Sequence, residues 1–246
     1  MSENILQNII QKKIEKVDKL KKSLDFKTLD ELINKNNSYI NFKEKIENNI
    51  KNNKTSIIAE IKKASPSAGI IIDDYNPLEI AQIYLNNKAT CLSVLTEEDY
   101  FLGNLIHISK IKDKINLPIL CKDFFIDKFQ IPLAKSYGAD AILIILAGVS
   151  DDLAYELYHE AKQALRFKDA LKGINNRNLK TLKTDINTTY DIHDVLVNHP
   201  GPLISESGIK TKEELLEISN KTSIKTFLIG ESLLKNLDKN SIFSVL

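Results

Sequence analysis

Seven short apolar runs alternate with longer amphipathic segments along the chain from residue 56 onward. The runs lie at 56–63, 91–95, 118–124, 141–146, 170–175, 202–206 and 226–230. The segments between them carry apolar residues at helical spacing, and the one after the first run begins with Asn76 as a helix cap and Pro77 in its first turn. Apolar strands that alternate with helices predict a parallel sheet covered by helices.

Two architectures contain such a sheet, a doubly wound open sheet and a closed (β/α) barrel. No GxGxxG or GxxxxGK[ST] loop follows the first run, which argues against an open sheet that binds nucleotides. We therefore favour a barrel of the TIM type, which has eight strands in roughly 250 residues. The chain has 246 residues but seven strand candidates. The prediction is an α/β fold, a TIM (β/α)8-type barrel that lacks one βα unit.

Residues 1–50 contain no strand candidate and are predicted to form helices. Apolar residues recur there every three to four positions, as at Ile5, Ile9 and Ile14. We expect a helical extension that covers one face of a single domain spanning 1–246. Its many lysines are expected to face solvent.

Composition excludes several classes of partner. The chain has 34 basic and 33 acidic residues and no basic stripe, so nucleic acid is not an expected partner. It carries no secretory signal and no apolar run near the ~20 residues that cross a membrane, so a cytoplasmic protein without a membrane partner is expected. Cys91 and Cys121 are expected to be buried and reduced, and the four histidines lack metal-ligand spacing. The oligomeric state stays open.

Charged residues end the first and third strand candidates. Glu60 and Lys62 are two positions apart and therefore share a face of a strand, where they would be costly to bury unless paired or functional. A structural ion pair is the alternative. Lys122 lies at the carboxyl end of an apolar strand, where barrel catalysts sit, and burial would lower its pKa. The alternative is a lysine that extends into solvent.

Later strand candidates end in polar and small residues. Asn175 and Arg177 are again two apart, and an arginine can hold a carboxylate in a bidentate fork, although NNRN could be an ordinary turn. Backbone N–H groups after the last two strands of a barrel often bind phosphate, although glycines there can serve turn geometry alone. The candidates for a phosphate site are Ser207, Gly208, Gly230 and Ser232.

Six strings in this order, AEIKKASPS, LSVLTEEDYFLG, LPILCKDFF, GINNRNLKT, SESGI and LIGESL, resemble the indole-3-glycerol-phosphate synthase family. The resemblance covers the whole chain. It implies a carbon–carbon lyase of tryptophan biosynthesis that closes the ring of 1-(2-carboxyphenylamino)-1-deoxyribulose 5-phosphate to indole-3-glycerol phosphate, releasing CO₂ and water. The implied partner is this small anionic substrate, and neither a metal nor an organic cofactor is implied.

The resemblance also implies residue roles. Lys122 would be the general acid that protonates the substrate ketone, Lys62 would hold the anthranilate carboxylate and assist proton transfer, and Glu60 would orient Lys62. Asn175 and Arg177 would contact the substrate near its carboxylate. The remaining implied residues are Glu206 on the sugar hydroxyls, Ser65, Ser207, Gly208, Gly230 and Ser232 on the phosphate, and Phe101 and Phe124 along the aromatic ring.

One βα unit of the family has no counterpart. The family carries a fifth strand between AILIIL and GINNRN, with a glutamate at its end as general base for dehydration. Here the helical segment 151–165 runs directly into 166–176, so strand 5, its helix and its glutamate are missing. An impaired lyase is the first expectation, and a non-catalytic sugar-phosphate-binding or scaffold remnant of the family is the alternative. A third alternative, an isomerase of the same pathway, conflicts with the pairing of Lys62 and Lys122.

Overall fold

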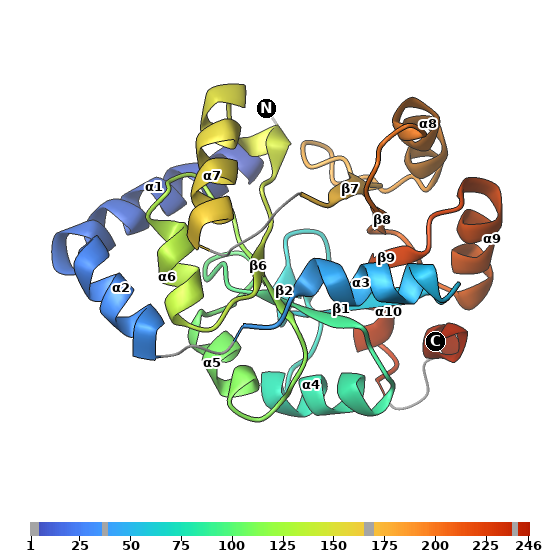
Figure 1. Ribbon diagram of the computed structural model, residues 1–246, viewed down its shortest axis with the longest axis horizontal. Helices are drawn as coiled ribbons and strands as arrows, with labels where there is room; N and C mark the ends of the chain where they lie inside the picture. Colours follow the sequence, from blue (N-terminus) through green and yellow to red (C-terminus); the bar gives the residue numbers. More distant parts are fainter. Residues whose placement is uncertain (1–4, 36–38, 165–169, 238–240) are drawn as a thin grey trace.

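Seven parallel strands form one curled sheet in the computed structural model, which describes residues 5–35, 39–164, 170–237 and 241–246 (Figure 1). The spatial order is β6-β5-β4-β1-β9-β8-β7. The strands are β1 (Ser56–Ile61), β4 (Cys91–Leu95), β5 (Ile119–Lys122), β6 (Ala141–Ile142), β7 (Lys172–Asn175), β8 (Leu203–Glu206) and β9 (Thr226–Ile229). Each of the seven strand candidates thus contains a strand, and the predicted barrel that lacks one unit is confirmed.

Helices follow the strands and cover the outer face of the sheet. They are α4 (Pro77–Asn86), α5 (Ile106–Lys112), α6 (Gln130–Ser136), α7 (Asp151–Ala164), α8 (Asn187–Leu196), α9 (Lys212–Thr222) and α10 (Glu231–Leu234). Asn76 caps α4 as predicted, because its side chain accepts the N–H groups of Leu78 and Glu79. Outward-pointing strand residues such as Ile57, Leu92 and Ile119 pack against these helices in the larger hydrophobic cluster.

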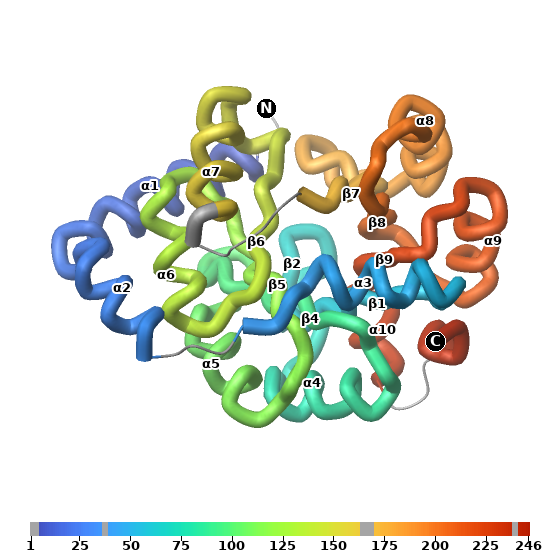
Figure 2. Tube along the Cα trace, viewed as in Figure 1, coloured from blue at the N-terminus to red at the C-terminus, as the bar shows by residue number. Residues whose placement is uncertain are grey.

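Within the described part of the N-terminal extension, residues 5–35 and 39–51, three helices form: α1 (Ile5–Ser23), α2 (Phe26–Lys35) and α3 (Phe42–Lys51). Figure 2 shows α1 and α2 on the same side of the molecule as α6, and α2 packs on α6. Helix α3 instead closes the amino end of the barrel, because Phe42 and Ile46 pack against inward-pointing strand residues such as Ile58 and Leu228. The extension therefore covers two separate surfaces of the barrel.

The strand period explains why polar residues gather at the opposite end of the barrel. On β1, Ile58 points inward to the cluster beneath α3, so Glu60, two positions later, points inward as well. On β5 the inward-pointing Leu120 is likewise followed two positions later by Lys122, which therefore points inward as well. The interior is therefore apolar near α3 and charged at the carboxyl ends of the strands.

The barrel is open between β6 and β7. These strands are the two ends of the sheet, and within the described residues no ladder joins them. A missing unit leaves two possibilities, direct pairing of the flanking strands or a gap between them, and the described residues show the gap. The junction at 165–169, where the missing unit was placed and where the predicted helix 151–165 ends, lies outside the described residues.

The structure differs from the sequence-based expectation at two places. The run 141–146 was expected to be one strand, but β6 ends at Ile142 and a 3-10 turn, Leu146–Gly148, follows. A strand that lacks a partner on its outer side has half of its backbone groups unpaired, so the ladder ends early. A short antiparallel hairpin after β1, formed by β2 (Ala64–Ser65) and β3 (Gly69–Ile70), was not predicted.

The two cysteines are free and buried, as predicted. None of the helices among the described residues is both long and apolar enough to cross a membrane. The same residues contain no group of histidine, cysteine, aspartate or glutamate side chains that could hold a metal ion.

Candidate active site

A cavity of about 480 Å³ lies at the carboxyl ends of the strands. The structure brings all the predicted site residues to its wall, although their roles toward a substrate stay predictions. They are Glu60, Lys62, Ser65, Phe101, Lys122, Phe124, Asn175, Arg177, Glu206, Ser207, Gly208, Gly230 and Ser232. Residues more than 100 positions apart meet here because parallel strands end at the same edge of the sheet.

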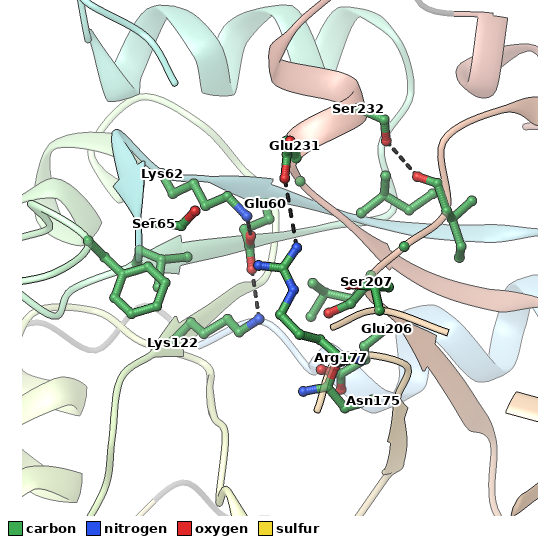
Figure 3. A pocket seen from close by; sticks show the side chains of 18 of the residues that line it. Glu60, Lys62, Ser65, Lys122, Asn175, Arg177, Glu206, Ser207, Glu231 and Ser232 are labelled. Carbon is green, nitrogen blue, oxygen red and sulfur yellow. Dashed lines mark hydrogen bonds and ion pairs between the residues drawn. The ribbon is translucent and has the colours of Figure 1, made fainter. Parts of the chain in front are cut away.

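Glu60 lies between two lysines at the centre of the cavity (Figure 3). Its carboxylate oxygens are 2.5 Å from the Lys62 Nζ and 2.7 Å from the Lys122 Nζ. The Glu60 side chain is 4% exposed. Burial alone would raise the pKa of Glu60, but Lys122 and Lys62 outweigh it and lower the pKa to about 2. The carboxylate is therefore a fixed negative charge that orients both ammonium groups.

Lys122 stays protonated, contrary to the expectation that burial would lower its pKa. Burial does act in that direction, but the charges of Glu60 and Glu206 more than offset it, so the pKa of Lys122 is raised. The side chain is 19% exposed and faces the cavity. A charged ammonium group at this position can donate a proton to a substrate oxygen.

Glu206 faces the lysines from the opposite wall, and a glycine makes room for it. A Cβ added at Gly173 of β7 would lie 2.1 Å from the Glu206 Oε1. Burial raises the pKa of Glu206, Lys122 acts in the opposite direction, and Glu60 raises it further. The pKa values of Glu60 and Glu206 are thus shifted in opposite directions, because Glu60 has two adjacent cations and Glu206 has a more distant one.

Arg177 crosses the cavity mouth from the β7 side. Its Nη1 donates to the Ser67 Oγ at 2.5 Å, and its Nη2 lies 3.8 Å from the Glu231 Oε2. Its Nε is buried and has no hydrogen-bond partner among the described residues. The Asn175 Oδ1 accepts the backbone N–H of Arg177 at 3.0 Å, which fixes the turn after β7. The guanidinium group therefore lies at the cavity wall, and its two Nη atoms are oriented by Ser67 and Glu231.

Four of the five predicted phosphate residues lie at the turns after β8 and β9, and the fifth, Ser65, lies on β2. Ser207 and Gly208 have φ of 68° and 81°, a left-handed pair that turns the chain sharply at the end of β8. Asn176 holds this turn, because its Nδ2 donates to the Ser207 carbonyl at 3.0 Å. The Ser232 Oγ donates to the Ile209 carbonyl at 2.7 Å, which ties the start of α10 to the same turn.

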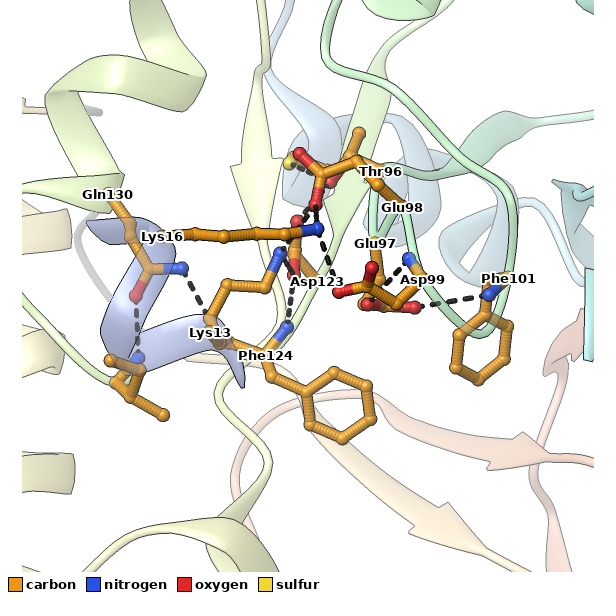
Figure 4. Close-up of polar contacts among 12 residues, drawn as sticks. Lys13, Lys16, Thr96, Glu97, Glu98, Asp99, Phe101, Asp123, Phe124 and Gln130 are labelled. Carbon is orange, nitrogen blue, oxygen red and sulfur yellow. Dashed lines mark hydrogen bonds and ion pairs between the residues drawn. The ribbon is translucent and has the colours of Figure 1, made fainter. Parts of the chain in front are cut away.

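The aromatic wall lies on the α1 side of the cavity. The rings of Phe101 and Phe124 have centroids 6.3 Å apart. Phe101 sits in a loop that folds around the Glu97 carboxylate, which accepts the N–H groups of Asp99, Tyr100 and Phe101 (Figure 4). This loop is thus an ordered part of the site.

Several residues in or beside the cavity were not predicted from the sequence. Asp123 and Glu231 each directly follow a predicted site residue, so their position at a strand end was the available signal. Gly173 and Asn176 lie within GINNRN, but nothing in the string indicates a space for Glu206 or a buried amide. Ser67 is the last residue of the AEIKKASPS string, and nothing in that string indicates its contact with Arg177.

The sequence of the chain matches a family model and several curated proteins. A family model described as indole-3-glycerol phosphate synthase matches residues 6–245. The indole-3-glycerol phosphate synthase of Clostridium acetobutylicum is 40% identical over 95% of this chain and 90% of its own length. That of Prochlorococcus marinus subsp. pastoris is 37% identical over 100% of this chain and 90% of its own length. The tryptophan biosynthesis protein TrpCF of Buchnera aphidicola subsp. Schizaphis graminum is 39% identical over 98% of this chain, which spans 55% of that protein.

The comparison with the Prochlorococcus protein extends over 267 positions against the 246 residues of this chain, so 21 positions have no residue here. Among solved structures, tryptophan synthase subunit alpha from Legionella pneumophila has a TM-score of 0.58 at 10% identity, over 85% of this chain and 94% of its own. At that identity the likeness concerns the fold alone. The match over nearly the whole sequence, together with the curated relatives, shows that this chain belongs to the indole-3-glycerol phosphate synthase family.

Proposed function

We propose that the chain converts 1-(2-carboxyphenylamino)-1-deoxyribulose 5-phosphate to indole-3-glycerol phosphate, CO₂ and water, and that the missing βα unit slows this reaction. The family and the relatives' names support tryptophan biosynthesis as the setting. The observation that carries the proposal is the Glu60 carboxylate clamped between Lys62 and Lys122 in a single cavity. It presents two charged ammonium groups to an anionic substrate.

In the proposed reaction the aromatic carbon that bears the carboxylate attacks the ketone carbon, and the ketone oxygen receives a proton from Lys122. Loss of CO₂ restores the aromatic ring, and loss of the new hydroxyl as water, with a ring proton, completes the indole. Lys62 holds the substrate carboxylate beside the attacking carbon, and Glu60 fixes both lysines. The raised pKa of Lys122 keeps it charged for the first proton transfer.

The opposite wall binds the rest of the substrate in this proposal. Asn175, Arg177 and Glu206 contact its polar groups, and Phe101 and Phe124 flank its aromatic ring. The phosphate lies against the turns that hold Ser207, Gly208, Gly230 and Ser232, with Ser65 facing them across the cavity. The first N–H groups of α10 have no acceptor within the helix, which suits them to a phosphate.

The proposed impairment rests on the gap beside β7. The edge strand that carries Asn175 has no partner on its outer side within the described residues, and the glutamates that line the cavity there come from β1, β8 and α10. Glu156 on α7 cannot replace it, because its carboxylate pairs with Lys128 at 3.6 Å and is 56% exposed. A displacement of ~1 Å costs about 100-fold in rate and loss of a general base ~10²–10⁴-fold, so we expect turnover at least ~10³-fold below a full-length relative.

A steady-state assay for indole-3-glycerol phosphate tests the proposal. The chain contains no tryptophan, so indole fluorescence of the product is not masked by the protein. Slow but measurable formation supports the lyase. Binding of the product without any turnover would instead support the alternative, a sugar-phosphate-binding remnant.

Crystals grown with sulfate or phosphate should hold an ion near the N–H groups of Gly208 and Gly230, and an ion found elsewhere but not there would contradict the phosphate assignment.

A further inference from the structure

Lys13 of α1 is buried, although lysines of the N-terminal helix were expected to face solvent. It is 5% exposed and lies in one row with Ile9 and Val17, which are 3% and 2% exposed. Residues four positions apart share a face of a helix, so this lysine interrupts the apolar face of α1. A buried lysine needs a partner, and both of its partners lie beside the active site.

Lys13 connects α1 to the segment that carries Lys122. Its Nζ lies 2.8 Å from the Asp123 Oδ1, which also accepts the backbone N–H of Phe124 at 2.8 Å. The Asp123 Oδ2 accepts the Thr96 hydroxyl at 2.7 Å. Burial lowers the pKa of Lys13, but Asp123 and Glu98 more than compensate, so the pKa is raised and the ion pair persists.

Lysines of α1 also hold the loop that carries Phe101 (Figure 4). The Glu98 Oε2 lies 3.4 Å from the Lys13 Nζ and 3.0 Å from the Lys16 Nζ. Lys16 reaches the Asp99 Oδ2 at 2.7 Å as well. The Lys12 Nζ lies over the Tyr100 ring, 5.0 Å from its centroid. One side of α1 therefore contacts the loop at three consecutive residues.

We propose that Lys13 is a positioning residue for the aromatic wall of the active site. Through Asp123 it fixes Phe124, and through Glu98 it fixes the loop that presents Phe101. It does not line the cavity itself, so it acts on a substrate through these two rings. The consequence for binding rests on the proposed function, because the wall is assigned to the aromatic ring of that substrate.

The test compares Lys13→Met with Lys19→Met. Lys19 is an exposed lysine of the same helix, and the structure records no ion pair for it among the described residues. The backbone N–H groups of residues 99–101 donate hydrogen bonds to the Glu97 carboxylate. Their hydrogen exchange should become at least ~10-fold faster in Lys13→Met and stay unchanged in Lys19→Met. This readout needs no ligand and no turnover. Unchanged exchange in Lys13→Met would overturn the proposal.

Lys13→Met leaves the Asp123 carboxylate buried without its cation, so it can also lower stability. The double variant Lys13→Met, Asp123→Asn removes the unpaired charge and keeps an acceptor for the Phe124 N–H. Its stability should recover, but exchange at 99–101 should stay fast, because the contact between residue 13 and Glu98 is still absent and only Lys16 remains on that carboxylate. Exchange that returns to the unmodified rate would show that Lys13 serves stability alone.

The affinities for two ligands, indole-3-glycerol phosphate and inorganic phosphate, test whether the loss of Lys13 affects the aromatic wall of the active site. Affinity for indole-3-glycerol phosphate should fall about 10-fold in the double variant, whereas affinity for inorganic phosphate should stay within about two-fold, because the phosphate turns lie on the other side of the cavity. Equal loss for both ligands would contradict a role at the aromatic wall. If the unmodified chain binds no product at all, the proposed function fails, while the exchange data still decide whether Lys13 positions the loop.

Discussion

Two halves of the barrel differ in how many of their strands are fully paired and buried. We call the half around β1, β4 and β5 the closed half, and the half around β7 and β8 the open half. On one side β1, β4 and β5 pair along most of their length, and all residues of β1 and β4 are buried. On the other side β7 ends the sheet, and three of its four residues are exposed. The following helix, α8, exposes Val195 by 80%. The closed half carries the lysine–glutamate cluster, and the open half carries the opposite wall.

This difference suggests how one fold can lose part of an activity and keep the rest. The cluster of Glu60, Lys62 and Lys122 depends on strands that keep both neighbours, so the missing unit leaves it intact. Asn175 and Arg177 depend on an edge strand. The lysines that can bind an anionic substrate thus lie on the closed half. The placement of Asn175 and Arg177 around that substrate depends on the open half.

The largest effect is expected at the centre of the closed half. Lys122→Ala should lower kcat by about 10²–10⁴-fold, because it removes the proposed acid, while product affinity changes modestly. Steady-state kinetics and calorimetric binding measure the two effects separately. The control is Lys128→Ala, whose side chain is 51% exposed. An unchanged kcat would remove Lys122 from the mechanism.

Stability should also depend more on the closed half. Lys112 pairs with the buried Asp140 at 2.5 Å, and Lys112→Met should cost about 3–5 kcal/mol because it leaves that carboxylate without its cation. On the open half the Thr189 hydroxyl contacts Asn176 and Ser205, both at 2.8 Å, and Thr189→Val should cost about 1–3 kcal/mol. Urea unfolding measures both, with the exposed Lys110→Met as control. The reverse order would refute the comparison.

Gly173→Ala tests the wall of the open half. The added Cβ would lie 2.1 Å from the Glu206 Oε1, so the carboxylate must move by about 1 Å or more, and kcat/KM should fall by about 100-fold. Glu206→Asp in the same chain shortens the side chain and should restore part of the loss. Gly148→Ala is the control, since its nearest contact is an ordinary 3.4 Å. If Gly173→Ala has normal kinetics, Glu206 needs no such space.

The smallest effects concern pH, and their signs are opposite on the two halves. The pKa of Glu60 is lowered to about 2, so its ionised form stabilises the fold above the ordinary value of 4.5, and this contribution is lost as pH falls toward 2. The pKa of Glu206 is raised, so its ionised form destabilises the fold at neutral pH, and that cost disappears below 4.5. Glu60→Gln should therefore reduce stability at pH 7, whereas Glu206→Gln should increase it. Unfolding free energies between pH 3 and 7 measure both, and effects of the same sign would contradict the assigned environments.

The strand-end residues could be predicted from the sequence because the strand period is simple. Pairs two positions apart, such as Glu60 with Lys62 and Asn175 with Arg177, share a face whatever the exact bounds of the strand. Parallel strands then bring these ends to one edge. The number of strands followed from the spacing of the apolar runs, without any knowledge of side-chain contacts.

Other features depend on contacts that no local pattern encodes. The early end of β6 follows from an absent neighbour, and the raised pKa of Lys122 follows from Glu60 and Glu206, which are distant in sequence. The space above Gly173 is set by a side chain of the adjacent strand. For Lys13 the prediction was wrong: the lysines of the N-terminal helix were expected to face solvent, but Lys13 is buried against Asp123, a partner that is distant in sequence.

The central claim is that the closed half is intact and the open half limits turnover. The most direct test measures kcat for indole-3-glycerol phosphate formation by this chain and by a version with a strand–helix unit, bearing an inward glutamate, inserted between Leu165 and Arg166. We predict product binding by both, a higher thermal midpoint for the longer chain, and a gain in kcat of at least ~10³-fold on insertion. A normal kcat and an ordinary midpoint in the unmodified chain would contradict the account.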